Sequence, residues 1–487
     1  MYGQLSEEGR QSSDALNVRH TENTHLLSDA RGNSKDDLVS SWTQDAQDLV
    51  KNAIPVIFAG LLQQSIGLCN VFSVGHLGKT ELAAVSLSLM TANITGYAVY
   101  QGMATALDTL CAQAYGSAKK PLIGLYFQQM VLILWLMTIP IGIIWLNSAT
   151  LLGAVVPDKS TADLAGTYLR ILLLGAPGYA AFEAGKRFVQ SQCIFHATTL
   201  VLLSVAPLNA FMNWLFVWHW QMGFIGAPLS TAVTNNLLPF FLFLYVYFID
   251  GRKCWNGFTL EVFQNWTLIL KLAFPGFLML EAEFLAFEIL TLGASHLSTT
   301  HLAAQSILSP LIALSFQVPF ALAIASSTRI ANLIGGGFAD RARQCARVTI
   351  LGASLVGTAN LFLMIGLAGY VAHLLTNDTS VIQQVMKVVP VIATFQLFDS
   401  LVINMNGALR ALGKQTIGSF VGVVCYYAIA MPISFTTAFR LQWNLIGLWS
   451  GIAVALFCNS IIVWIYLAYK ASWEDAVNAA RSRHTKP

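Results

Sequence analysis

The alternation of apolar and polar stretches divides the chain into a polar beginning and a long series of hydrophobic segments. From about residue 48 onward, apolar runs recur with short polar breaks, each long enough (roughly 20 residues) to cross a bilayer as a helix. Twelve such runs lie at about residues 52–74, 82–112, 122–146, 164–185, 195–218, 223–249, 268–294, 300–334, 345–375, 381–409, 417–439 and 444–469. The pattern therefore predicts an all-α integral membrane protein with twelve transmembrane helices.

Composition supports this prediction and excludes other classes. Of the 487 residues, 55% are hydrophobic and 10% are charged, whereas soluble domains carry about 25% charged residues. The net charge of +3 is too small to indicate a nucleic-acid partner. No P-loop, HExxH or GxSxG motif is present, so we expect no nucleotide, no cofactor and no enzymatic activity. The seven cysteines show no metal-binding spacing, so we expect neither a metal site nor a disulfide framework.

Short sequence echoes indicate an internal repeat. Three pairs of segments recur at offsets of 220, 219 and 221 residues: Leu82-Ala-Ala with Leu302-Ala-Ala, Ala112–Gly116 with Ala331–Gly335, and Ile225–Ser230 with Ile446–Ser450. Each repeat contains six helices, so the halves have the same orientation and should be related by a pseudo-two-fold axis along the membrane normal. We therefore expect an N-terminal lobe at 48–250, a cytoplasmic loop at 251–264 and a C-terminal lobe at 265–470.

The tails and loops carry signals for orientation and location. Residues 1–47 have the composition of a disordered tail, and residues 471–487 form a second tail. Lys and Arg concentrate in alternate loops, which places both termini in the cytoplasm by the positive-inside rule. A segment from Glu22 to Leu27 resembles an acidic dileucine sorting signal and favours a vacuolar or endosomal membrane, with the plasma membrane as the alternative. A glycosylation sequon begins at Asn377, and its use stays open.

The seventh apolar segment carries the most informative residues, Glu281, Glu283 and Glu288. A carboxylate in hydrocarbon costs ~3 kcal/mol or more, so such residues usually mark an ion or substrate path. Glu283 lies 12 residues from Lys271, about 18 Å along a helix, and Asp399 in the tenth segment has a similar depth. Two buried carboxylates close together can hold a proton near neutral pH and release it when a cation enters. Either acid could instead be a structural hydrogen-bond acceptor.

Helical phase separates the three glutamates. Glu281 and Glu288 are seven residues apart and share a face, whereas Glu283 lies about 140° from Glu288. One straight helix cannot direct all three into one cavity, and the sequence leaves open which of them is the exception. Polar residues at membrane depth are weaker candidates for a substrate cavity, because such residues more often hydrogen-bond between helices. They are Gln64, Asn93, Asn213, Gln305, Asn404 and Tyr427.

Several motifs resemble one known family. Asn93-x-Thr-Gly96 and the block from Gly102 to Gly116 are very similar to the second-helix signature of eukaryotic multidrug and toxic compound extrusion (MATE) transporters. Further matches follow in order: Val74–Gly78, Arg187-Phe-x-Gln-x-Gln192, Pro319-Phe-x-Leu with Ser327-Thr-Arg329, and Asp399-Ser-Leu with Gly407 and Arg410. The similarity covers about residues 48–470. It implies a twelve-helix, two-lobed fold and the export of organic cations, drugs or metabolites, driven by protons or, in some bacterial members, by sodium.

The resemblance also implies which acids couple transport. The family's seventh-helix glutamate falls on Glu283 when the segment is anchored on Phe287-Glu288, and on Glu281 when it is anchored on Leu280; we favour Glu283. The family's tenth-helix acid falls on Asp399. The first helix lacks the aspartate of bacterial members, so coupling should reside in the C-terminal lobe. We expect a monomeric proton-coupled antiporter for small organic cations, with Glu288 as a further coupling candidate. A lipid-linked precursor flippase of the same superfamily and sodium-coupled antiport are the alternatives.

Overall fold

The computed structural model describes residues 35–154, 158–376 and 378–485, and this part of the chain is helical without any strand. Ten helical segments have the length and apolar composition of a membrane span. Two more complete the predicted twelve. One consists of two helices of 14 and 16 residues joined by a 3-10 turn, and the other is the 30-residue helix that carries Lys271 and the three glutamates. The dileucine-like segment and Asn377 lie outside the described residues.

The first lobe contains six spans and one short helix. They are α2 (Lys35–Gly75); α3 (Lys79–Ala92), η2 (Asn93–Tyr97), α4 (Ala98–Ala104) and α5 (Ala106–Gly116); α6 (Lys120–Leu146); α7 (Ser148–Gly153); α8 (Lys159–Leu172), η3 (Leu173–Gly175) and α9 (Ala176–Ser191); α10 (His196–Trp214) and η4 (Leu215–His219); and η5 (Gly223–Ile225) with α11 (Gly226–Phe248). Residues 35–47, which composition assigns to a polar tail, form the first turns of α2.

The second lobe repeats this arrangement. After η6 (Arg252–Cys254) and η7 (Leu260–Phe263) come α12 (Trp266–Ser295); α13 (Thr299–Gly335); α14 (Ala339–Leu375); α15 (Thr379–Leu412); α16 (Gln415–Val423), η8 (Val424–Ala430), α17 (Met431–Phe435) and η9 (Thr436–Arg440); and α18 (Asn444–Ile465) with η10 (Tyr466–Lys470). A final helix, α19 (Trp473–Thr485), follows. The π-helical turns η2 and η8 do not occupy equivalent positions in the two lobes, because η2 lies in the second span and η8 lies in the eleventh.

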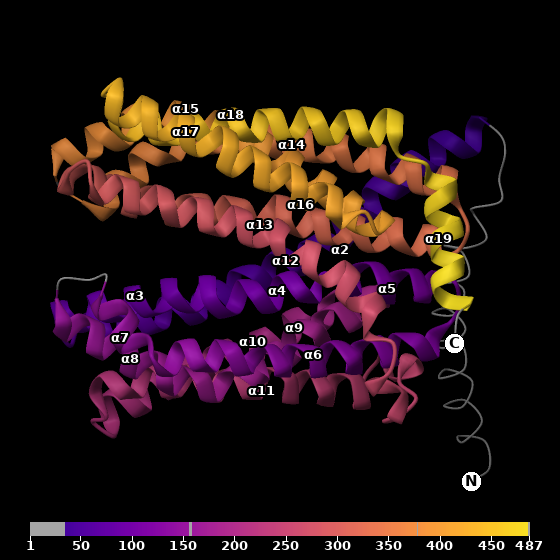
Figure 1. Cartoon of the computed structure of the whole chain (residues 1–487), viewed down its shortest axis with the longest axis horizontal. Helices are drawn as coiled ribbons and strands as arrows, with labels where there is room; N and C mark the ends of the chain where they lie inside the picture. The colour runs from indigo at the N-terminus through magenta and orange to yellow at the C-terminus, as the bar shows by residue number, and fades with distance from the viewer. Residues whose placement is uncertain (1–34, 155–157, 377, 486–487) are drawn as a thin grey trace, which may run out of the picture.

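Each lobe packs around its own apolar core, and the lobes meet at one end of the molecule. Leu49 and Val56 of α2 pack against Leu322 and Ala325 of α13 in a small core that both lobes share. Figure 1 shows the ribbons of the two lobes converging toward α19 and diverging toward the opposite end. We call these the α19 end and the far end. The structure is therefore closed between the lobes at its α19 end.

The closure depends on two glycines at repeat-equivalent positions. A Cβ atom on Gly116 of α5 would collide with the backbone carbonyl of Asn332 in α13, and one on Gly335 of α13 would collide with the carbonyl of Gln113 in α5. Because only glycine lets two helices approach this closely, the crossing of α5 and α13 requires both residues. The two copies of the repeat thus meet each other near the predicted pseudo-two-fold axis.

Candidate functional site

Helix α12 lies between the lobes and directs its glutamates to different surroundings. On one side it contacts α4 and α5 of the first lobe, and on the other it contacts α16 of the second. Glu283 is only 7% exposed, and its neighbours Ala282 and Ala286 belong to the core of the second lobe. Glu281 and Glu288 are half-buried. The difference in burial follows the helical phase that the sequence indicates, and Glu283 is the acid that faces the second lobe.

Glu283 and Asp399 form a buried acid pair inside the second lobe. Asp399 of α15 is 3% exposed and interacts electrostatically with Glu283. Its Oδ2 atom has no hydrogen-bond partner among the described residues. No lysine or arginine forms a salt bridge with either acid within the described part of the chain. Burying two carboxylates side by side without a salt bridge disfavours ionising both at the same time.

A tyrosine that the sequence did not single out as a partner completes this pair. Tyr426 lies in η8, is 3% exposed and interacts electrostatically with both Glu283 and Asp399. Its hydroxyl has no hydrogen-bond partner among the described residues. Gln396, one turn before Asp399 on α15, is fully buried, and neither of its amide atoms has a described partner. The acid pair is therefore surrounded by buried polar atoms that could bind a proton, a water molecule or a cation.

The other glutamates of α12 have different partners. Glu281 interacts with the hydroxyl of Tyr427, which is half-buried and donates a hydrogen bond to the carbonyl of Ala282 at 3.3 Å. Glu288 lies two turns from Glu281 on the same face and forms no salt bridge among the described residues. The structure thus brings Glu283 and Asp399 together and places Glu281 and Glu288 apart from them.

The weaker cavity candidates fall into two groups. Gln64 and Asn93 are exposed. Asn213, Gln305 and Asn404 are buried and hydrogen-bonded: Asn213 donates to Asn209 at 3.2 Å, Gln305 accepts from the indole of Trp449 at 2.9 Å, and Asn404 donates to the carbonyl of Pro319 at 3.2 Å. The bonds of Gln305 and Asn404 join helices within the second lobe. Their contribution to a substrate cavity stays a prediction.

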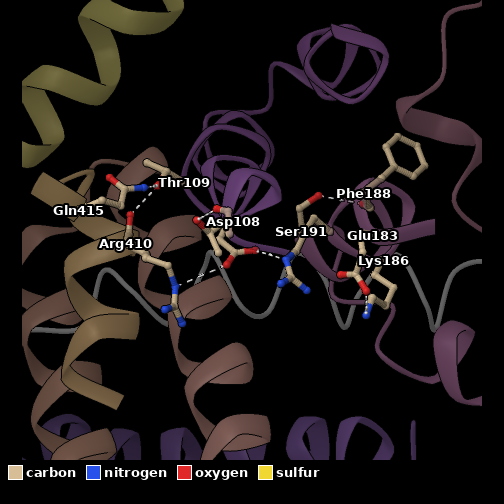
Figure 2. Close-up of polar contacts among 11 residues, drawn as sticks. Asp108, Thr109, Glu183, Lys186, Phe188, Ser191, Arg410 and Gln415 are labelled. Atoms are coloured by element: carbon tan, nitrogen blue, oxygen red, sulfur yellow. Dashed lines mark hydrogen bonds and ion pairs between the residues drawn. The ribbon is translucent and has the colours of Figure 1, made fainter. Parts of the chain in front are cut away.

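A charged cluster joins the two lobes at the α19 end. Asp108 of α5 forms ion pairs with two guanidinium groups: Arg187 Nε of α9 lies 3.0 Å from its Oδ1, and Arg410 Nε of α15 lies 3.5 Å from its Oδ2. Figure 2 shows Asp108 with a dashed line to Arg410 on one side and its second ion pair on the other. Arg410 belongs to the second lobe, and it is only 3% exposed. Asp108 thus connects the lobes through one buried carboxylate.

Hydrogen bonds to the end of α15 reinforce this cluster. Thr109 Oγ1 donates to the carbonyl of Arg410 at 2.5 Å, Gln113 Nε2 donates to the carbonyl of Ala411 at 2.8 Å, and Gln415 Nε2 donates to Thr109 Oγ1 at 2.8 Å. Arg483 of α19 donates to Gln113 Oε1 at 3.0 Å. The C-terminal helix therefore contacts the same crossing.

A second set of ion pairs joins α13 to α2. Arg329 of the second lobe donates to Asp45 Oδ1 at 2.6 Å and to Asp48 Oδ2 at 2.8 Å. Asp45 is fully buried. With the Asp108 cluster, these contacts close the molecule at its α19 end.

Within the first lobe, a buried glutamate has its own cation. Lys186 Nζ lies 2.6 Å from Glu183 Oε1 and donates to Gln63 Oε1 at 3.2 Å. Gln63 and Gln101 in turn donate to the hydroxyl of Tyr179, at 3.3 and 2.7 Å. Glu183 is fully buried, and Figure 2 shows it beside Lys186. The spacing of Glu183 and Lys186, three residues apart on a helix, was the signal in the sequence that predicts this pair.

A groove of about 610 Å³ lies far from these charges, between α2, α10 and η4 of the first lobe. Its walls include Phe72, His76, Trp214 and Trp218. It contains neither acid of the pair, so this groove and the acid pair belong to different lobes.

The fold and the buried charges define a class: an integral membrane protein that crosses the bilayer twelve times and consists of two similar lobes. A family model described as MatE matches residues 55–215 and again residues 275–436. The second match begins 220 residues after the first (275 − 55), which confirms the internal repeat. The chain belongs to the MATE family of transporters, as its sequence motifs predict.

Known relatives agree with this assignment. An uncharacterized transporter of Schizosaccharomyces pombe is 37% identical over 466 residues, covering 95% of this chain and 86% of the relative. The mouse multidrug and toxin extrusion protein 2 is 34% identical and the human protein 1 is 30% identical; the matches cover 90% and 91% of this chain, and 77% and 78% of those proteins.

Solved structures show the same fold. The crystal structure of the eukaryotic MATE transporter AtDTX14 superimposes with a TM-score of 0.86 at 24% identity, covering 91% of this chain and 99% of that one. The bent form of the Vibrio cholerae MATE transporter VcmN gives 0.76 at 18% identity, covering 91% and 99%. The predicted fold of twelve helices in two lobes is confirmed.

Proposed function

We propose that this transporter exports small organic cations in exchange for protons, with Glu283 and Asp399 as the coupling carboxylates. The observation that carries the proposal is the burial of both acids next to each other in one lobe, without a salt bridge to a described residue. A pair of this kind binds a proton when it faces an acidic compartment and releases it on the other side. The names of the mouse and human relatives, multidrug and toxin extrusion proteins, support the substrate class.

The positions of the basic residues support a cytoplasmic α19 end. Loops at that end carry Lys119, Arg252, Lys253, Arg343 and Lys414, whereas the far end carries few basic residues, among them Lys79 and Lys159. By the positive-inside rule both termini then face the cytoplasm. The conformation closed at the α19 end is accordingly the one closed on the cytoplasmic side. We infer a vacuolar or endosomal membrane, or the plasma membrane, as its location.

In this scheme a proton from the outer side binds the acid pair and favours substrate release there. The lobes then close at the far end and open at the α19 end, where the proton leaves and a cation binds. The substrate must bind the other protonation state more tightly, because a ligand shifts an equilibrium only through differential affinity. Neutralising a buried charge supplies this difference.

The alternatives make different demands on the central charges. A flippase for a lipid diphosphate would need free basic groups in its centre, but Arg187 and Arg410 share Asp108, and Lys186 is paired with Glu183. Sodium coupling would need the same acid pair with a different ion. The ion gradient used in the test therefore separates proton from sodium coupling.

The test is exchange in proteoliposomes. The purified protein is reconstituted, a pH gradient or a sodium gradient is imposed, and uptake of a fluorescent organic cation is followed. We expect uptake that depends on the pH gradient and falls to the level of protein-free vesicles in Glu283→Gln and Asp399→Asn. Unchanged exchange in both variants would remove the acid pair from the mechanism. Loss of cation uptake in Glu281→Gln, together with normal uptake in Glu283→Gln, would assign the coupling role to Glu281 instead of Glu283.

A further inference from the structure

Arg410 lies where the interlobe cluster and the acid pair come closest. We propose that Arg410 is the positioning residue through which a proton on Glu283 releases the closure at the α19 end. The inference deepens the proposed function and rests on it. It is carried by the position of Arg410: this residue forms an ion pair with Asp108 across the lobe boundary, and its charge and that of Glu283 influence each other electrostatically without forming a salt bridge.

The contact between Arg410 and Asp108 is weak for a buried ion pair. Its atoms are 3.5 Å apart, and Arg410 Nε has no hydrogen-bond partner among the described residues. Asp108 shares its charge with Arg187, whose Nε is closer at 3.0 Å. Buried ion pairs stabilise a structure only when their geometry is good and their remaining hydrogen-bonding groups are satisfied. The guanidinium of Arg410 therefore depends on a further negative charge.

The charges near Arg410 balance only when Glu283 is ionised. Arg187 and Arg410 contribute two positive charges, and Asp108 contributes one negative charge. Glu283 supplies the second negative charge. Among the described residues, the charged groups with the strongest electrostatic influence on Arg410 are these three, Asp108, Arg187 and Glu283. Asp399 lies eleven residues away on the same helix, about 16 Å along its axis, so Glu283 is the member of the acid pair whose charge acts on Arg410.

Neighbouring ionic contacts do not alter this balance. Glu183 and Lys186 neutralise each other within the first lobe, and Arg329 has Asp45 and Asp48 as its own partners. When Glu283 takes up a proton, one positive charge in the buried cluster is left uncompensated. Such a charge is costly until it reaches water. Opening the lobes at the α19 end exposes Arg410 to water, so protonation favours the opening that antiport requires at this step.

A native cysteine can report the opening. Cys193 lies between α9 and α10 in the first lobe, is half-buried, and its sulfur lies 3.4 Å from Nδ2 of Asn332 in α13. Separation of the lobes at the α19 end moves Asn332 away from Cys193 and makes the thiol more accessible to solvent. The experiment measures the rate at which N-ethylmaleimide alkylates Cys193 in the purified full-length protein. Peptide mass spectrometry distinguishes this thiol from the other six, and the rate is divided by that of the unfolded chain.

All variants are compared at one pH of about 8.5, well above the ordinary pKa of a carboxyl group, about 4. We expect Glu283→Gln, which imitates the protonated acid, to raise the alkylation rate of Cys193 about tenfold. The double variant Glu283→Gln with Arg410→Gln removes one positive charge as well, and its rate should return to within about twofold of the wild type. Glu281→Gln, on the same helix without contact to Arg410, should leave the rate unchanged.

One further variant keeps the test decisive. If Arg410→Gln does not give a monodisperse protein, Arg187→Gln in the Glu283→Gln background removes the same charge and should restore closure. A fast rate that persists in both double variants would overturn the proposal, because lost packing at Glu283 would produce that result. If Glu283→Gln abolishes transport but leaves the alkylation rate of Cys193 at its wild-type value, the acid pair remains supported and the proposed role of Arg410 is wrong. If Glu283→Gln transports normally, the proposed function itself fails.

Discussion

The two lobes each bury a glutamate in a membrane-spanning helix, and the two residues have opposite surroundings. Glu183 in the first lobe is 0% exposed and lies 2.6 Å from Lys186. Glu283 faces the core of the second lobe beside Asp399, a second acid, and forms no salt bridge among the described residues. One glutamate has a lysine as an ion-pair partner on its own helix, and the other has a second acid as a neighbour.

This difference distinguishes Glu183, whose charge has a structural partner, from Glu283, which we propose takes part in transport. A carboxylate next to a fixed ammonium group stays ionised, and its pair adds no net charge to the lobe. A carboxylate next to another carboxylate cannot stay ionised together with it, so the pair exchanges protons with its surroundings. The repeat therefore preserves the fold of both lobes, while the coupling chemistry that we propose lies in the second. The following predictions test this division, beginning with the largest expected effect.

The largest effect should come from removing the acids of the two lobes in turn. Asp399→Asn should reduce pH-driven cation uptake to the level of protein-free vesicles, because an amide cannot bind and release a proton. The matched control, Glu183→Gln with Lys186→Met, removes the charged pair of the first lobe as a unit and should keep a pH-driven uptake clearly above that level. If this control abolishes pH-driven uptake while Asp399→Asn retains it, the assignment of the two lobes is reversed.

The next effect is on stability and concerns Lys186 alone. Lys186→Met leaves Glu183 buried without its cation, which should lower the free energy of unfolding by about 3–5 kcal/mol. Adding Glu183→Gln should recover a large part of this loss, because the uncompensated charge is gone. Thermal unfolding of the detergent-solubilised variants, read by tryptophan fluorescence, gives the comparison. A single variant as stable as the wild type would show that Glu183 does not depend on Lys186.

Part of this division could be predicted from the sequence. Apolar run lengths locate the spans, and the echo between Ala112–Gly116 and Ala331–Gly335 reveals the repeat. Equal depth along their helices suggests Glu283 and Asp399 as partners, since depth can be counted from the sequence. Helical phase shows that Glu281 and Glu283 face different directions, but it cannot show which of them faces the second lobe. That choice depends on how α12 packs against its neighbours.

Other features depend on contacts that no local pattern contains. Asp108 and Arg410 are 302 residues apart (410 − 108), and they meet where α5 packs against the end of α15. Tyr426 reaches the acid pair from the π-helical turn η8. A π-helical turn rotates the following side chains relative to a regular helix, so the position of Tyr426 could not be obtained from a regular helical wheel.

A smaller effect should follow from widening the glycine crossing. Gly335→Leu places a side chain against the carbonyl of Gln113, and overpacking of this kind typically costs about 1–3 kcal/mol. The cost applies to the form closed at the α19 end, so alkylation of Cys193 should become faster. Gly366→Leu in α14 is the control, because a Cβ there meets open space. Equal rates in the two variants would show that the crossing does not limit closure.

The smallest predicted effect concerns the hydroxyl of Tyr426. This buried group interacts with both acids and has no hydrogen-bond partner among the described residues. We expect it to donate a hydrogen bond to whichever carboxylate is ionised, and such a bond is worth about 0.5–1.5 kcal/mol or somewhat more for a charged acceptor. Tyr426→Phe should therefore slow pH-driven exchange about 2- to 10-fold without abolishing it.

The neighbouring tyrosine provides the matched control. The hydroxyl of Tyr427 donates to the carbonyl of Ala282, and the acid that influences it electrostatically is Glu281. Tyr427→Phe removes the same atom from the same helical segment, so it should change the pH dependence of exchange less than Tyr426→Phe does. A larger effect at Tyr427 would point to Glu281 as the coupling acid. Because both variants differ from the wild type by one oxygen, their comparison locates the proton site without removing either carboxylate.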